Sequence, residues 1–325
     1  MLDHLGQVAQ AAAENFGENE ALVFEERSFS FLELNTMVES AAGGLSALGL
    51  VKGDVVTLYA ANSWEWIVSY YAIARLGAVI NPVNTMLTPN EIEYVVEDCG
   101  AKAIIASPEK VAAILPVKGT SDVKEIISFG DEIEAGAVSF NALLERGASA
   151  PAVDDIDPAS LSTIGYTSGT TGHPKGAMQS HRAVIINGAM TSQLHMRGSN
   201  DVVVSALPCP HVYGNVLMNG MMLFGTKLVL HKTFDPAAVL GDIARHKETI
   251  FDGVPTMYMF MLNSPAFADA DLSSLTRCYV GGQTMPVATM KAVEEGFKTP
   301  LIELWGMTEI AGLGSTHPLY GTNKH

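Results

Sequence analysis

Short runs rich in β-branched residues alternate with helical patterns along most of this chain, and this alternation most constrains its fold. The first series is VVTLYA at 55–60, a helical stretch at 63–77, AVINPV at 78–83, a helical stretch at 88–100 and AKAIIAS at 101–107. Strands that alternate with helices in this way predict parallel sheets with helices packed across them. The sequence therefore predicts an α/β fold.

The helix ends carry signals of their own. Thr88 is suited to the N-cap of the second helical stretch, with Glu91 three residues later, and Gly100 follows the last turn. A second series of the same kind begins near Val202 and runs to PLIELWG at 300–306. Two α/β series therefore flank the middle of the chain.

Composition excludes several classes of protein. The 325 residues include 19 Lys and Arg against 35 Asp and Glu, a formal charge of −16 that opposes binding to nucleic acid. Cys99, Cys209 and Cys278 have no CxxC spacing, so neither a disulfide framework nor a zinc site is expected. The apolar stretch 212–230 contains two Asn, three Gly and a Lys, which argues against a membrane span. We expect a cytoplasmic protein that contacts membranes peripherally at most.

The stretch YTSGTTGHPKGAM at 166–178 concentrates glycines, hydroxyls and one lysine. It follows a short strand pattern and precedes a helical one, so we expect a strand-to-helix turn at the carboxyl edge of a sheet, where open α/β sheets bind ligands. Glycines let backbone N–H groups approach an anion, and hydroxyls and a lysine add donors, which suits a polyphosphate. Pro174 and Gly176 flank the lysine, so this is not a Walker A loop. The predicted phosphate-binding residues are Thr167, Ser168, Gly169, Thr170, Thr171, Gly172 and Lys175.

Three further segments follow the glycine-rich stretch, and their order along the chain is informative. After YTSGTTGHPKG come LPCPHVYG, VGGQTMP and LWGMTE. Together they resemble the motifs of the adenylate-forming superfamily, which comprises acyl-CoA synthetases, luciferases and peptide-synthetase adenylation modules. Trp305 stands where that family has tyrosine. The resemblance covers nearly the whole chain.

The resemblance implies a reaction and a set of roles. ATP and an acid would form an acyl-AMP with release of pyrophosphate, and the acyl group would pass to coenzyme A, with Mg²⁺ as cofactor. The resemblance implies catalytic roles for His211 beside the acid's carboxylate, Thr308 at the α-phosphate and Glu309 at the metal. The implied adenine-binding residues are Gly281, Gly282, Gln283, Trp305, Gly306 and Met307.

The resemblance also implies an acid pocket formed by Val212, Tyr213, Gly214 and Val254, with Gly281, Gly282 and the residues near Met307. This lining is apolar and offers no basic partner for a second carboxylate, which favours an apolar acid. We expect an acyl-CoA synthetase for a medium- or long-chain fatty acid. An aryl-acid CoA ligase, an amino-acid adenylation module and a non-catalytic nucleotide or acyl binder remain alternatives.

The family pattern implies an architecture of two packed, mostly parallel sheets with helices between and outside them. Residues of about 50–180 would form the first subdomain, and about 1–48 with 190–310 the second. Residues 311–325 would be a truncated tail, because the family's β-barrel subdomain and its C-terminal lid domain with a catalytic lysine do not follow. We therefore expect a fragment with poor turnover. The expected partners are a carboxylic acid and coenzyme A, and homodimerisation is left open.

Overall fold

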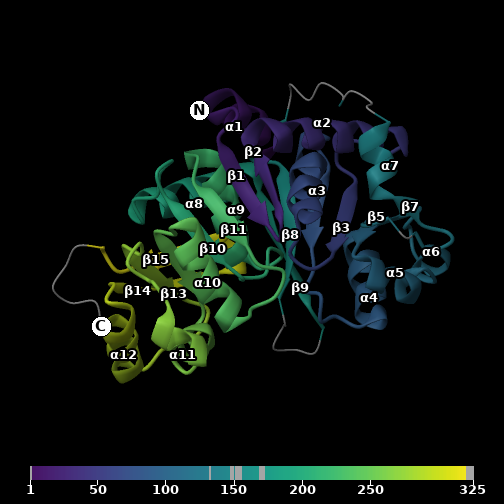
Figure 1. Ribbon diagram of the computed structural model, residues 1–325. Coiled ribbons are helices and arrows are strands. Elements are labelled where there is room, and N and C mark those ends of the chain that lie inside the picture. The colour runs from purple at the N-terminus through teal and green to yellow at the C-terminus, as the bar shows by residue number, and fades with distance from the viewer. Residues whose placement is uncertain (1, 132, 147–149, 151–155, 168–172, 320–325) are drawn as a thin grey trace. The chain divides into compact units, whose positions relative to one another are not determined.

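The computed structural model describes residues 2–131, 133–146, 150, 156–167 and 173–319 (Figure 1). It divides into two compact units. The first comprises 1–18 and 31–186, and the second comprises 19–30 and 187–325. Each unit is built around a sheet of its own.

The first unit contains a seven-stranded sheet in the order β7-β6-β5-β3-β4-β8-β9. All neighbouring strands are parallel except the last pair, β8 and β9. Its central strands are buried on both faces, as expected of strands covered by helices on both sides. The strands are β3 (Val55–Tyr59), β4 (Val79–Pro82), β5 (Ala101–Ala106), β6 (Glu125–Ser128), β7 (Val138–Ser139), β8 (Leu161–Thr167) and β9 (Lys175–Ser180).

Capping residues in the sequence set the ends of helices in this unit, as α4 shows. Thr88 and Glu91 form a capping box at the start of α4, and Gly100 ends that helix with a φ of 66°, so the predicted helix limits are confirmed. α3 is buried on nearly all sides, so it needs cover from other helices. The helices are η1 (Leu5–Gln7), α1 (Val8–Phe16), α2 (Phe31–Ala47), α3 (Trp64–Arg75), α4 (Pro89–Cys99), α5 (Pro108–Ile114), α6 (Val117–Thr120) and α7 (Phe140–Glu145).

The second unit contains an eight-stranded sheet in the order β15-β14-β13-β12-β10-β11-β1-β2. Its six inner strands are parallel, and antiparallel β2 and β15 close the two edges. The prediction of two mostly parallel sheets is therefore confirmed. The strands are β1 (Glu20–Phe24), β2 (Arg27–Ser30), β10 (Val202–Ser205), β11 (Lys227–Leu230), β12 (Ile250–Gly253), β13 (Arg277–Val280), β14 (Leu301–Met307) and β15 (Gly312–Thr316).

Helices connect the parallel strands of the second unit, with α11 and α12 beside β13 and β14 in Figure 1. They are α9 (Val212–Phe224), α10 (Pro236–His246), α11 (Pro255–Leu262), η2 (Pro265–Asp269) and α12 (Val287–Phe297). The short η3 (Thr308–Ile310) lies between the antiparallel strands β14 and β15. One further helix, α8 (His181–Leu194), contains the boundary between the two units.

The predicted division assigns the N-terminal 48 residues to the second subdomain, but the structure splits them. Only the β1–β2 hairpin joins the second sheet, by pairing with β11. α1 and α2 belong to the first unit, where α2 packs against α3 and α7. Gly44 of α2 makes this close approach possible, because a Cβ there would lie 2.7 Å from Cβ of Leu143.

The expectation that the chain from residue 311 onward forms a tail is wrong for Gly312–Thr316. These residues form β15, which pairs antiparallel with β14. The strand is rich in glycine, which is unfavourable for strands in general. Here close packing requires glycine, because a Cβ on Gly312 would lie 2.5 Å from Cγ2 of Val216 and one on Gly314 would lie 2.5 Å from Cζ3 of Trp305.

Candidate functional site

The predicted phosphate loop lies in the first unit, and the structure describes its two ends. Thr167 is the last residue of β8, and Lys175 is the first residue of β9 and exposed. The two residues pair across the antiparallel strands. Ser168, Gly169, Thr170, Thr171 and Gly172 lie outside the described residues.

The expected strand-to-helix turn is wrong, because the loop joins two antiparallel strands and α8 begins only at His181. Lys175–Ser180 lacks the apolar alternation of a strand, since only Gln179 is buried there. Gly176 lets the two strands approach, because a Cβ there would lie 2.7 Å from Cγ2 of Ile164. The loop still follows the carboxyl end of a strand whose neighbour β4 is parallel to it.

α4 supports the end of this loop that precedes Lys175. The ring of Tyr94 stacks on that of His173 at 5.0 Å, and the Tyr94 hydroxyl donates to the carbonyl of Pro174 at 3.4 Å. Tyr166 is fixed to the same helix, because its hydroxyl donates to Asp98 at 2.5 Å. Sequence reasoning missed Tyr94 and Asp98, which lie in a helix whose pattern predicted only packing.

A pocket in the second unit brings together many of the other predicted residues. We call it the α9 pocket, because it lies at the first turn of that helix; it contains about 550 Å³ of space, part of it open to solvent. Seven predicted residues line it, namely His211, Val212, Tyr213, Gly282, Gly306, Met307 and Thr308. Sequence reasoning missed five others, namely Thr191, Val216, Leu304, Gly312 and Leu313.

Three residues predicted for the acid pocket are not among those that line the α9 pocket. A Cβ on Gly214 would lie 2.3 Å from the carbonyl oxygen of Pro208, so this glycine packs α9 against the preceding turn. A Cβ on Gly281 would lie 2.4 Å from Cδ1 of Leu304. Val254 lies beside Gly282, whose φ of 83° is one that favours glycine. Gly281 and Val254 therefore lie against Leu304 and Gly282, which line the pocket.

His211 is the N-cap of α9, and its Nδ1 accepts a hydrogen bond of 3.2 Å from the backbone N–H of Tyr213. Because Nδ1 accepts, the neutral ring carries its proton on Nε2. His211 is exposed, yet the protein around its ring disfavours the charged form and lowers its pKa. The side chain is therefore a neutral hydrogen-bond donor at the positive end of a helix.

A second pocket adjoins the first. We call it the Trp305 pocket; it contains about 1050 Å³ of space, part of it open to solvent, and shares Gly282, Leu304 and Gly306 with the α9 pocket. Trp305 is 58% exposed, and its ring covers Gly314, where a Cβ would lie 2.5 Å from Cζ3. The remaining lining is Gln283, Thr284, Glu303, Ser315, Thr316 and His317.

Thr308 and Glu309 follow β14 in the short helix η3. Thr308 lines the α9 pocket, and the carboxylate of Glu309 is exposed next to it in the sequence. Among the described residues there is no cluster of three His, Cys, Asp or Glu that could hold a metal. A single exposed carboxylate such as that of Glu309 is compatible with a hard cation that otherwise takes phosphate oxygens and water, as Mg²⁺ does.

Comparison with known proteins identifies the family. A model described as AMP-binding enzyme matches residues 9–325. The chain belongs to the AMP-binding enzyme family. It is 33% identical to an indoleacetate–CoA ligase of Aromatoleum aromaticum, over 89% of this chain and 57% of the relative. It is 27% identical to a long-chain-fatty-acid–CoA ligase of Bacillus subtilis, over 98% of this chain and 62% of the relative.

Solved structures of this AMP-binding family share the fold. The crystal structure of the anthranilate CoA ligase AuaEII with anthranoyl-AMP superposes with a TM-score of 0.93 at 25% identity, over 99% of this chain and 63% of that one. This likeness confirms the predicted fold class, that of the N-terminal domain of adenylate-forming enzymes. The chain spans 57% and 62% of the two curated relatives named above.

Two findings bear on the remaining expectations for this AMP-binding protein. Within the described ranges, no helix combines the length and the apolar character needed to cross a bilayer. The three cysteines are free, with Cys209 and Cys278 buried and Cys99 partly buried. Burial raises the pKa of Cys99 to about 11 and those of the other two thiols to about 12, so they are unreactive thiols at neutral pH.

Proposed function

We propose that this chain is the nucleotide- and acid-binding part of an ATP-dependent acid–thiol ligase. The enzyme would activate an apolar carboxylic acid, either a fatty acid or an aryl acid, as its acyl-AMP and transfer the acyl group to coenzyme A. The observation that supports this most is the pair of adjoining pockets that share Gly282, Leu304 and Gly306. One suits an apolar acid and the other a nucleotide base, which is the arrangement that joining a carboxylate to a nucleotide requires.

The α9 pocket suits the acid. Its lining is mostly apolar or glycine, and none of its described residues is acidic or basic apart from His211. An ammonium group or a second carboxylate would thus lack a charged partner there. The carboxylate of an apolar acid would face the N-terminus of α9 and the Nε2–H of His211, which both stabilise an anion.

The Trp305 pocket suits adenine. An exposed indole offers a large face for stacking, and the backbone around Gly282 leaves room for a flat base. Thr308 lines the α9 pocket and its neighbour Glu309 is exposed, so we assign them to the α-phosphate and to Mg²⁺. When bound, the cation would offset the negative charge of the phosphates. The role of Lys175 and its loop at the outer phosphates rests on the sequence motif alone.

Relatives named as ligases for indoleacetate and for a long-chain fatty acid support the reaction class without deciding between aryl and fatty acids. An amino-acid adenylation module is disfavoured because the described lining of the α9 pocket has no carboxylate for an ammonium. A non-catalytic binder would bind ATP yet show no exchange of pyrophosphate into ATP with any acid.

Thermal-shift and calorimetric titrations test the proposal. The ligands are ATP–Mg²⁺ and the non-hydrolysable decanoyl, phenylacetyl and succinyl sulfamoyladenosines. A ligand that binds only the folded state raises the midpoint by mass action. We expect the decanoyl or the phenylacetyl compound to bind more tightly than the succinyl compound. Trp305→Ala should weaken binding about 5- to 150-fold, as loss of base stacking does, while Trp305→Phe retains most of the affinity. Absence of binding by every adenosine compound would refute the proposal.

A further inference from the structure

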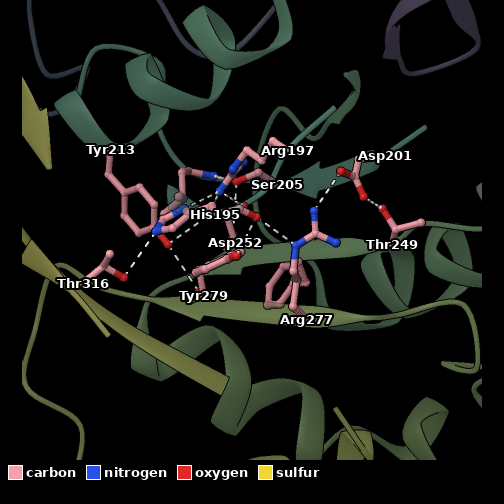
Figure 2. A network of polar contacts seen from close by, with 12 residues as sticks. His195, Arg197, Asp201, Ser205, Tyr213, Thr249, Asp252, Arg277, Tyr279 and Thr316 are labelled. Carbon is pink, nitrogen blue, oxygen red and sulfur yellow. Dashed lines mark hydrogen bonds and ion pairs between the residues drawn. The ribbon is translucent and has the colours of Figure 1, made fainter. Parts of the chain in front are cut away.

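A buried ion pair lies behind the α9 pocket. Nη2 of Arg197, which follows α8, lies 2.9 Å from both carboxylate oxygens of Asp252 in β12 (Figure 2). The two side chains are only 2% and 0% exposed. Burial disfavours the charge of Arg197, but Asp252 outweighs this effect and the pKa of Arg197 lies above its usual value. Arg197 therefore keeps its charge although it is buried.

Nη2 alone makes both contacts to Asp252, so the guanidinium does not use two nitrogens as arginine does in its strongest carboxylate pairs. Nε of Arg197 is buried, and no partner for it exists among the residues that the structure describes. Since desolvation of two charges can exceed their attraction, such a pair is weak evidence for stability. A role in fixing neighbouring side chains accounts better for a carboxylate, that of Asp252, in a strand that is otherwise apolar.

Tyr213 connects the pair to the pocket. Its ring lines the α9 pocket, and its hydroxyl lies 3.1 Å from Oδ1 of Asp252 and 3.3 Å from the carbonyl of Tyr279. Burial raises the pKa of Tyr213 well above its usual value, and Asp252 raises it further, so the hydroxyl remains a donor. Hydrogen bonds to a charged acceptor are stronger than neutral ones, so the carboxylate holds the ring in one orientation.

The same arginine reaches a second wall of the pocket through His195. The His195 ring stacks on Tyr279 at 3.8 Å, and its Nδ1 lies 3.3 Å from Nη2 of Arg197. Burial and the two nearby arginines lower the pKa of His195 to about 2, so the ring is neutral. Arginine can only donate, so Nδ1 accepts and Nε2–H donates to Oγ1 of Thr316 at 3.3 Å (Figure 2). Thr316 is the last residue of β15, whose Gly312 and Leu313 line the pocket.

We propose that Arg197 and Asp252 are positioning residues that set acid selectivity, by fixing Tyr213 on one wall of the α9 pocket and β15 on another. The inference rests on the proposed function, since it takes this pocket as the acid site. The pair touches no substrate. It acts by limiting how far the two walls can move, so that acids of different width meet a pocket of fixed shape.

The test measures the ratio of two affinities in this chain. Calorimetry gives the Kd of decanoyl and of phenylacetyl sulfamoyladenosine, with acyl-free sulfamoyladenosine as the reference. Tyr213→Phe keeps the ring and removes the hydroxyl. The double variant Arg197→Met with Asp252→Leu replaces both charges by apolar groups, an exchange that buried pairs often tolerate. We expect each change to shift the ratio of the decanoyl Kd to the phenylacetyl Kd about tenfold, because a lost hydrogen bond to a charged group has an effect of this size. The Kd of acyl-free sulfamoyladenosine should stay unchanged.

Combining the changes sharpens the test. If the pair acts through the Tyr213 hydroxyl, Tyr213→Phe should shift the ratio no further in the double variant. Tyr258→Phe is the matched control, because the Tyr258 hydroxyl is buried and donates to the same Tyr279 carbonyl at 2.7 Å, while Tyr258 does not line the pocket. It should lower the thermal midpoint as Tyr213→Phe does and leave the ratio unchanged.

The two proposals can fail separately. If the unchanged chain binds neither acyl compound more tightly than the reference, the acid pocket itself is refuted. The second case is that the unchanged chain binds the acyl compounds, but Tyr213→Phe gives the same ratio of Kd values as Tyr258→Phe. The positioning role is then refuted, and the acid pocket stands. This comparison remains available even where the double variant does not fold.

Discussion

Glu248 gives the most demanding test of the physical reasoning. It lies between the C-cap of α10 and the start of β12, with no exposed surface. Both of its carboxyl oxygens are buried, and within the described part of the chain neither has a hydrogen-bond partner. Burial, and to a smaller extent the charge of Asp242, raises the pKa of Glu248 to about 9. The side chain is therefore a neutral acid at pH 7.

This pKa makes stability depend on pH in a defined direction. An unfolded glutamate titrates near pH 4.3, so around neutral pH the folded state binds a proton that the unfolded state lacks. The contribution is fully present below pH 4 and is lost as pH rises towards 9, at most about 1.4 kcal/mol per pH unit. Between pH 7 and 8.5, Glu248 should lower the free energy of unfolding by roughly 1 to 2 kcal/mol.

Glu248→Gln isolates this effect, because it keeps the shape and removes the titration. Urea unfolding at pH 7.0, 7.5, 8.0 and 8.5 gives the free energy of unfolding of both proteins. Only their difference is informative, since the raised pKa values of Cys209 and Cys278 also lower stability above about pH 8. The variant should gain on the parent by roughly 1 to 2 kcal/mol across this range. A constant difference would show that Glu248 is ionised in the fold and that burial has been misjudged.

Two further predictions concern the backbone. Gly312→Ala should cost more than about 1 kcal/mol and weaken binding of acyl sulfamoyladenosines, because φ is 144° and the new Cβ would lie 2.5 Å from both Asn187 and Val216; urea unfolding and calorimetry check this. Its control, Gly241→Ala in α10, meets no atom within 4 Å and should stabilise by about 0.5–1 kcal/mol. Thr88→Ala should lower the free energy of unfolding by about 1 kcal/mol by removing the N-cap of α4. It should leave the affinity for acyl sulfamoyladenosines, which lack the outer phosphates, unchanged; calorimetry checks this, and a weaker affinity would show that α4 also affects the acid and adenine pockets.

The parts of the fold that the sequence predicted correctly are those in which local signals agree with burial. The β-branched runs became parallel strands, and the cap signals at Thr88 and Gly100 set the limits of α4. Of the strands that it missed, β9 and β15 have few side chains that alternate between buried and exposed positions. Both are edge strands, and each pairs antiparallel with the strand directly before it in the chain. Edge position and glycine content hid them, since strand propensity mostly reports packing on a half-buried surface.

In the candidate site too, some residues could be predicted from local sequence and others depend on tertiary packing. Trp305 lies near the carboxyl end of β14, Thr308 follows that strand and His211 lies in the loop after β10, so parallel topology gathers the segments that carry these motif residues. What shapes the pocket lies farther apart in the chain, since Arg197 and Asp252 are 55 positions apart and no local pattern pairs them. One signal was nevertheless present: a carboxylate in the apolar run TIFDGVP needs a buried partner. Sequence could thus show that Asp252 is paired, but the choice of Arg197, and the link through Tyr213 to the pocket wall, depend on tertiary packing.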